Sequence, residues 1–144
     1  MKILFDTNVV LDLMLDRKPF STVSAQLFSK VESGDIVGFI SATTVTTIYY
    51  LATKVVGTQQ AKIEVNKLFT LFEIAPVNRA VLEKATELNF SDFEDAVIHE
   101  AAIHIGVDAI VSRNIKDFRQ SILPIYSPNE LSKILKSIQE TTGE

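Results

Sequence analysis

The chain of 144 residues contains no cysteine, no tryptophan, and only five glycines and four prolines. The absence of cysteine excludes disulfide bonds and thiolate-coordinated metal sites. No apolar run reaches the ~18 residues that a membrane-spanning helix needs. The start of the chain also lacks the layout of a signal peptide, because Asp6 interrupts its apolar run. We therefore expect a cytoplasmic protein that does not associate with a membrane.

Positive charge is in short supply as well: 14 basic residues stand against 18 acidic ones, for a formal net charge of −4. This balance argues against broad, sequence-independent wrapping of nucleic acid, which relies on many Lys and Arg side chains at phosphates. It is compatible with a nuclease, because a cluster of metal-binding carboxylates lowers the formal charge until divalent cations bind.

Short apolar runs alternate along the chain with stretches of helical periodicity, which is typical of an α/β fold with a mainly parallel sheet. The segments expected as strands are 3–5, 36–40, 109–111 and 124–126, with a short edge strand at 73–76. The segments expected as helices are 9–15, 25–34, 43–55, 61–72, 81–88, 92–105 and about 127–140. In residues 43–55 two signals disagree: the apolar residues have helical spacing, but the many β-branched residues have a low helix propensity. No linker or repeat divides the chain, so we predict a single domain over residues 1–144, with the last helix packing on it or extending from it.

Asp6 directly follows the first strand, Ile3–Phe5, which we expect to be central in the sheet. Open α/β sheets bind ligands and metals at the carboxyl ends of their strands. A buried, unpaired carboxylate is costly, so Asp6 requires a cation or strong hydrogen-bond donors there. The alternative is that Asp6 only caps the next helix, a position that Asp favours.

Further polar residues are expected at the same edge of the sheet. Asp92 and Asp95 lie one turn apart at the start of a helix, and Asp117 and Asn114 follow the strand at 109–111. Oxygen ligands without cysteine favour Mg²⁺ or Mn²⁺, which support phosphodiester hydrolysis. The structural alternative is that Asp92 and Asp117 only cap helices and that Asn114 is only a turn residue.

Three other acidic residues are assigned structural roles. Ser91 and Glu94 have the spacing of a capping box, which would satisfy the Glu94 carboxylate locally. Asp12 and Asp16 lie four residues apart in the first helical stretch and are expected on its solvated face.

Four segments, in this order, resemble the PIN-domain family and most closely the bacterial toxins of the VapC type: FDTNVVLD, SATTVTTIYYLATK, DFEDAVIHEAA and IVSRNIKDF. The resemblance spans roughly residues 2–127. It implies a three-layer α/β/α fold with a sheet of four to five strands, and acidic residues that bind Mg²⁺ or Mn²⁺ to cleave RNA. Asp6, Asp95 and Asp117 match the family's first, third and fourth acidic positions, with Asp92 as an accessory metal ligand. Thr7, Asn8 and Asn114 match polar accessory positions.

The second acidic position departs from the family pattern. Members usually carry a Glu there, whereas the aligned residue here is Thr47, and no acid lies between Ile40 and Gln60. Loss of even an outer partner of a metal site lowers affinity or activity by ~10–100-fold. Two hypotheses follow: a metal-dependent ribonuclease of a toxin–antitoxin pair, or a catalytically weakened scaffold that binds RNA or a partner protein without cutting.

A third hypothesis is a haloacid-dehalogenase-like phosphatase, which also opens with a strand ending in Asp. That class needs a second acid two residues later, where this chain has Asn8. For the toxin hypothesis, the resemblance implies an antitoxin partner whose arm, rich in Lys and Arg, occupies the acidic site. It also implies a possible homodimer.

Overall fold

The computed structural model describes residues 1–141; the last three residues of the predicted domain, 142–144, lie outside the described residues. Five strands form one parallel sheet in the order β3-β2-β1-β4-β5. Their bounds are Lys2–Phe5 for β1, Val37–Ser41 for β2, Glu73–Ala75 for β3, Ala109–Val111 for β4 and Ile125–Tyr126 for β5. The predictions of a central first strand and of an edge strand near residue 73 are confirmed.

Within residues 1–141, six α-helices and one 3₁₀ helix, η1, lie between the strands, and a seventh α-helix follows the last strand. Their bounds are α1 Thr7–Met14, α2 Phe20–Glu32, α3 Ala42–Val56, α4 Thr58–Leu71, α5 Arg79–Thr86, α6 Phe93–Ile105, η1 Ile115–Phe118 and α7 Pro128–Thr141. None of the helices described is long and apolar enough to cross a membrane.

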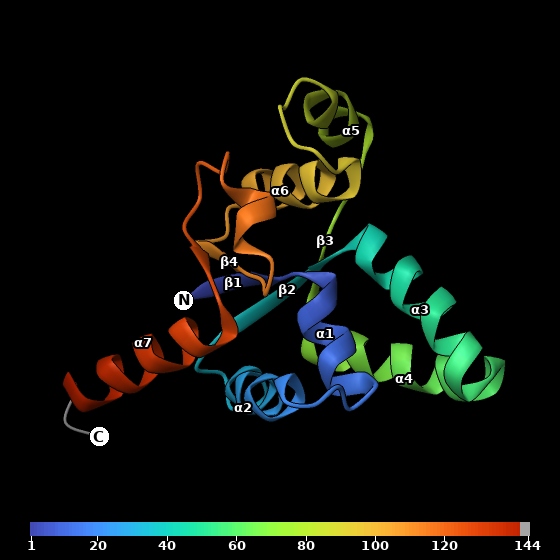
Figure 1. Ribbon diagram of the computed structural model, residues 1–144, viewed down its shortest axis with the longest axis vertical. Helices are drawn as coiled ribbons and strands as arrows, with labels where there is room; N and C mark the ends of the chain where they lie inside the picture. The colour runs from blue at the N-terminus through green and yellow to red at the C-terminus, as the bar shows by residue number, and fades with distance from the viewer. Residues whose placement is uncertain (142–144) are drawn as a thin grey trace.

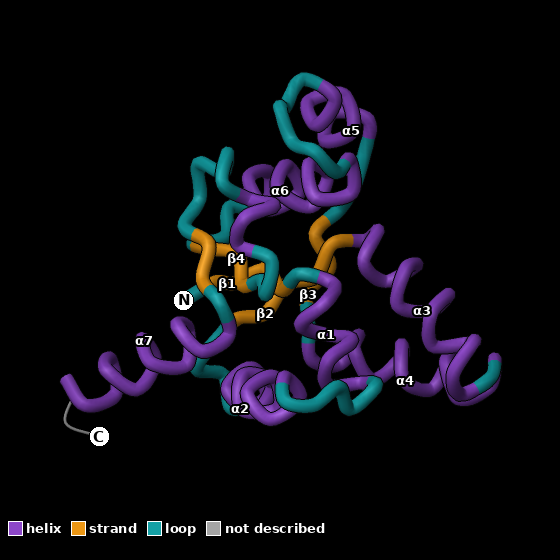
Figure 2. The backbone as a smooth tube through the Cα atoms, in the orientation of Figure 1, coloured by secondary structure: helices purple, strands orange, loops and turns teal. Residues whose placement is uncertain are grey.

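The sheet separates two cores, which gives the predicted three-layer α/β/α arrangement. Ile3 and Phe5 of β1 pack with α1, α2, α4 and α7 on one face, and Leu4 packs with α5 and α6 on the other. Figures 1 and 2 show α5 and α6 on one side of the sheet and α1, α2 and α7 on the opposite side. Because both faces of β1 are covered after its exposed first residue, Lys2, the three following residues, Ile3, Leu4 and Phe5, are all apolar and do not alternate with polar ones.

Tertiary packing decides the conflict in α3 in favour of the helix. Ser41 ends β2 and caps α3, its Oγ accepting a hydrogen bond from Thr43 N at 3.3 Å. Ile48 and Ala52 point into the core at helical spacing and are essentially inaccessible to solvent. The burial of these side chains outweighs the weak helix propensity of the β-branched residues around them.

The last helix packs on the domain through its first turns. Ser127 and Glu130 form a capping box, in which Ser127 N donates to Glu130 Oε1 and Glu130 N donates to Ser127 Oγ. Leu131, in the first turn of α7, is completely buried, and the contacts of α7 are mainly with α2. The rest of α7 extends past the body of the domain in Figure 1.

Candidate active site

Three neighbouring strands place polar residues at one edge of the sheet. β1 ends before Asp6, β2 ends at Ser41, and β4 ends before Ser112. All three side chains are buried, and Asp6 is only 3% exposed. The predicted convergence of these strand ends is therefore confirmed, because β2, β1 and β4 are adjacent and parallel.

The Asp6 carboxylate is held by a hydrogen bond to each oxygen. Oδ1 accepts from Thr7 N at 2.8 Å, which caps α1, and Oδ2 accepts from Ser112 Oγ at 2.7 Å. Capping α1 therefore uses only one of the two Asp6 oxygens, and the carboxylate stays at the carboxyl edge of the sheet. Burial raises the pKa of Asp6, while these two hydrogen bonds lower it and the charges of Glu94 and Asp117 raise it further.

The amino end of α6 brings its acidic residues to the same edge. Asp92 caps this helix, with Oδ1 accepting from Asp95 N at 3.1 Å, so the predicted capping box between Ser91 and Glu94 is wrong. Asp95 is half-buried. Its pKa is raised to about 7, first by burial and then by the negative charges of Asp6, Asp92, Asp117 and Glu94.

Glu94, which the sequence predicted in a capping box with Ser91, instead lies beside the other acidic residues of the site. With Asp92 serving as the cap, the Glu94 side chain is free to reach α3, where its Oε1 accepts a hydrogen bond from Thr47 Oγ1 at 3.4 Å. Its charge also raises the pKa of both Asp6 and Asp95. Thr47 of α3 is thus in contact with the carboxylate of Glu94 on α6. The sequence signal for this was the pair of acids in Glu94-Asp95, which the capping-box interpretation hid.

The loop after β4 contributes Asp117 and Asn114. Asp117 lies exposed in η1, and its charge raises the pKa of Asp6 and Asp95, so it shares their electrostatic environment. Asn114 N donates to Ser112 Oγ at 3.0 Å, which links this loop to the hydroxyl that holds Asp6. Within residues 1–141, no hydrogen bond ties the side-chain amides of Asn8 and Asn114 to these carboxylates.

A divalent cation suits this group of residues by charge and by ligand type. Asp6, Glu94, Asp95 and Asp117 are oxygen donors whose mutual repulsion a cation would relieve. Throughout the described chain, no three acidic or imidazole side chains yet surround one point closely enough to coordinate an ion. To coordinate an ion together, these side chains would have to turn toward a common point.

A buried ion pair fixes the loop that carries Ser112 and Asp117. The Arg113 guanidinium binds both oxygens of Asp12, with Nε to Oδ2 at 2.6 Å and a second N–H to Oδ1 at 3.1 Å. Arg17 approaches the same carboxylate at 3.8 Å, and the Arg113 guanidinium stacks on the Phe20 ring at 4.0 Å. The expectation of a solvated Asp12 is wrong: its side chain is 1% exposed, because Arg113 arrives from a segment about one hundred residues away.

Replacing Arg113 with Met should lower the free energy of unfolding by about 3 kcal/mol. The change leaves Asp12 buried with only the longer contact to Arg17, and breaking one side of a buried pair costs roughly 3–5 kcal/mol. Urea denaturation measures the effect, with Lys133→Met on the exposed face of α7 as the control. The double variant Asp12→Asn, Arg113→Met should recover part of the loss. A loss below about 1 kcal/mol would mean that Arg17 alone satisfies Asp12.

Comparison with known proteins agrees with this architecture. A model of the PIN domain matches residues 2–116 of the chain. Ribonuclease VapC1 of Aquifex aeolicus (strain VF5) is 28% identical over 134 residues, which cover 90% of this chain and 92% of the relative.

Solved structures show the same fold. A toxin–antitoxin complex from Klebsiella pneumoniae has a TM-score of 0.67 and 24% identity, over 88% of this chain and 97% of that one. VapC20 of Mycobacterium tuberculosis, a sarcin–ricin loop cleaving toxin, has a TM-score of 0.62 and 17% identity, over 75% of this chain and 86% of the other.

Proposed function

Because the chain belongs to the PIN-domain family, we propose that it is a Mg²⁺- or Mn²⁺-dependent endoribonuclease and the toxin of a toxin–antitoxin pair. The observation that carries the proposal is the buried carboxylate of Asp6 at the end of the central strand, with three further acids close enough to raise its pKa or that of Asp95. The relative named a ribonuclease and the toxin named for cleaving the sarcin–ricin loop support the choice of RNA as substrate.

Asp6, Asp95 and Asp117 are the proposed metal ligands and catalytic residues. When bound, the ion supplies positive charge beside the scissile phosphate and lowers the pKa of the attacking water. Ser112 and Thr7 fix the orientation of the Asp6 carboxylate, and Asp92 fixes the amino end of α6 and so the position of Asp95. Asn8 and Asn114 remain proposed accessory residues.

Glu94 completes the acidic group in place of the acid that position 47 lacks. The Thr47 hydroxyl donates a hydrogen bond to the Glu94 carboxylate. Position 47 on α3 therefore carries no charge itself but helps to position the negative charge of Glu94 on α6. This arrangement supports an active enzyme over the weakened scaffold, because the count of four carboxylates is kept. Glu94 is therefore a proposed metal ligand, and Thr47 its positioning residue.

Metal dependence tests the proposed function directly. The purified protein should cleave RNA when Mg²⁺ or Mn²⁺ is present, lose cleavage on addition of EDTA, and regain it when Mn²⁺ is restored in excess. Gel analysis of a structured RNA measures cleavage, and calorimetry measures Mn²⁺ binding separately. Saturable Mn²⁺ binding without cleavage of any RNA would favour the scaffold hypothesis. Cleavage that persists in EDTA would contradict the metal mechanism.

The affinity for Mn²⁺ should rise with pH until slightly above pH 7. In the metal-free protein the pKa of Asp95 is about 7, so below that pH the ion must displace a proton from this carboxyl. One displaced proton predicts an affinity about tenfold weaker at pH 6 than at pH 8. Calorimetry in two buffers with different ionisation enthalpies counts the proton, and Asp95→Asn should flatten the dependence. Equal affinities at pH 6 and pH 8 would contradict this prediction.

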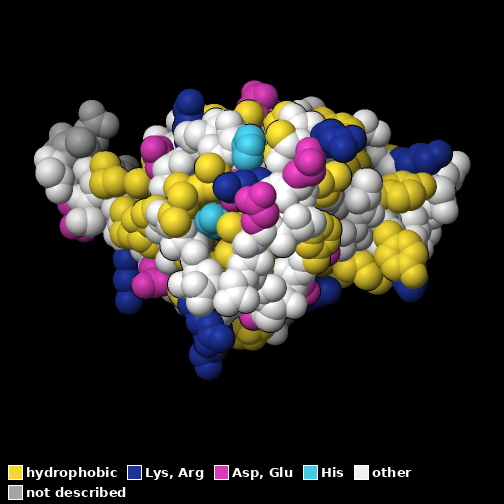
Figure 3. Space-filling view, turned by 90° about the horizontal axis from the view of Figure 1, so that it is seen from above, with side chains coloured by type: hydrophobic (Ala, Val, Ile, Leu, Met, Phe, Trp, Pro, Cys, Tyr) yellow, Lys and Arg dark blue, Asp and Glu magenta, His cyan; other side chains and the backbone are white. Residues whose placement is uncertain are grey.

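A protein partner is the other part of the proposal. The end of the molecule formed by α3 and α4 carries large apolar side chains that are half or more exposed: Tyr50, Val55, Ile63 and Phe69. Figure 3 shows apolar surface at that end, on the right of the view. The toxin–antitoxin complex from Klebsiella pneumoniae supports an antitoxin as the partner. Co-purification with the neighbouring gene product tests it, and light scattering tests the predicted homodimer.

A further inference from the structure

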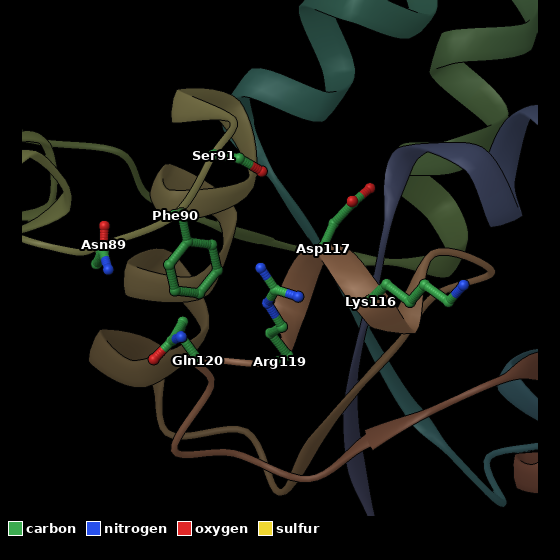
Figure 4. A pocket seen from close by; sticks show the side chains of 7 residues that line it. All are labelled: Asn89, Phe90, Ser91, Lys116, Asp117, Arg119 and Gln120. Atoms are coloured by element: carbon green, nitrogen blue, oxygen red, sulfur yellow. The ribbon is translucent and has the colours of Figure 1, made fainter.

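A hollow of about 320 Å³ opens beside the acidic group. One wall is the segment between α5 and α6, with Phe90 and Ser91, and the other is η1 and the residues after it, with Asp117, Arg119 and Gln120. Figure 4 shows the Arg119 guanidinium pointing into the space between the Phe90 ring and Asp117. The hollow is within the size range of small-molecule sites, ~300–1,000 Å³.

Positive charge without a protein partner gathers around η1. Arg119 and Lys116 are exposed, and neither has an acidic side chain within ion-pair distance anywhere in residues 1–141. In Figure 4 the two side chains extend from η1 in different directions, Arg119 toward Phe90 and Lys116 away from it. Two unpaired cations next to Asp117, in a chain of net charge −4, favour an anionic ligand here.

The Phe90 ring forms an aromatic wall of the hollow and is held in place from behind. It packs edge-to-face on Phe118, with ring centroids 6.0 Å apart, and against the His99 ring at 5.2 Å. Both supporting side chains are buried, so the orientation of Phe90 is set by the core. A fixed aromatic ring beside an unpaired guanidinium is the combination that binds a base together with a phosphate.

A second hollow lies against the same 3₁₀ helix. It measures about 350 Å³ and is lined by Arg113, Asn114, Ile115, Lys116 and Asp117. Lys116 and Asp117 line both hollows. A ligand longer than one nucleotide can therefore cross η1 at Asp117 and occupy space on either side.

We propose that the hollow at Phe90 and Arg119 binds one nucleotide of single-stranded RNA next to the scissile phosphodiester, with the base stacked on Phe90 and a phosphate held by Arg119. This inference rests on the proposed ribonuclease function. It adds the path that the bound RNA strand takes from the acidic group into the hollow. A Lys- and Arg-rich antitoxin arm is a poorer occupant, because Arg119 and Lys116 would repel it. Exposed single-stranded bases are also the part of RNA that aromatic side chains read.

The test measures binding of a fluorescent single-stranded RNA of about ten nucleotides by anisotropy. Asp6→Asn serves as the parent so that the RNA stays intact. Arg119→Gln should weaken binding about tenfold and reduce the slope of log K against log salt by about 0.7, the value for one phosphate contact. Phe90→Leu should weaken binding by a similar factor without changing that slope. Lys133→Gln, which removes one charge from α7, is the control and should change neither.

An abasic scan on the parent protein tests base stacking from the RNA side, and Phe90→Leu serves there as the comparison. Removing one base at a time from the RNA should reveal a single position whose loss weakens binding to the parent but not to Phe90→Leu. One outcome would contradict the subsite and leave the ribonuclease proposal standing. In it, wild-type protein cleaves RNA, Arg119→Gln and Phe90→Leu bind the RNA as tightly as the parent protein, and the parent binds every abasic RNA as tightly as the intact RNA. If wild-type protein neither cleaves nor binds RNA, both proposals are overturned.

Discussion

Asp6→Asn should reduce RNA cleavage by more than about 100-fold and weaken Mn²⁺ binding to a similar extent. Asp6 lies at the end of the central strand among the other acids, and losing even an outer partner of a metal site costs ~10–100-fold. The fold should survive, because an Asn side chain still accepts the capping hydrogen bond from Thr7 N. Cleavage kinetics, Mn²⁺ calorimetry and urea denaturation measure the three quantities on the same preparation.

Stability separates a functional loss from a structural one. Burial raises the pKa of Asp6, which means that its charge is unfavourable in the folded, metal-free protein. Removing that charge should leave the free energy of unfolding equal or higher while activity disappears. Asp35→Asn, an exposed carboxylate paired with Lys30, is the control and should cleave normally. An Asp6→Asn protein with full cleavage would remove Asp6 from the mechanism.

The second large effect concerns Glu94. Glu94→Gln keeps an oxygen that accepts from Thr47 but removes the charge, and we expect Mn²⁺ affinity and cleavage to fall by about 10–100-fold. Because Thr47 and Glu94 are in contact, a carboxylate placed at position 47 would enter the same space. The double variant Thr47→Glu, Glu94→Gln should therefore regain most of the lost affinity. Mn²⁺ titration reads this out without relying on catalysis.

The single variant Thr47→Glu completes this double-mutant cycle. It places two carboxylates in contact, so the metal-free protein should lose stability and the two substitutions should not be additive. Glu83→Gln, an exposed residue on α5 paired with Arg79, serves as the matched control. Wild-type Mn²⁺ affinity in Glu94→Gln would show that Glu94 takes no part in ion binding. A large gain in cleavage from Thr47→Glu alone would instead support the weakened-scaffold hypothesis.

Local patterns predicted most of the fold because they report which side chains must be buried. The runs at Ile3–Phe5 and Ala109–Val111 are too short for helices and are covered on both faces in the structure. The helix expected over residues 92–105 does end there, at Gly106, which adopts the left-handed conformation with φ of 78°. The boundaries were less accurate: α1 begins at Thr7, two residues earlier than expected, because Asp6 provides the cap.

The candidate site was predicted in part. Asp6, Asp95 and Asp117 share one electrostatic environment, as the strand ends and motifs suggested. The pairing of Glu94 with Thr47 spans 47 positions, and that of Arg113 with Asp12 spans 101. No local pattern encodes contacts of this range. The capping-box motif at Ser91 was misleading because Asp92 competes for the same role one residue later.

By itself, the sequence determined the α/β architecture, the central position of the first strand and the acids that follow the strand ends, since periodicity and strand-end chemistry are local properties. Only the tertiary structure decided which acids face one another. It moved Glu94 from a helix cap to the vicinity of Asp6, and it turned Asp12 from a solvated residue into the buried anchor of the Arg113 loop. Both outcomes depend on the packing of α6 and of the segment after β4 against the sheet, which brings distant side chains within hydrogen-bond distance.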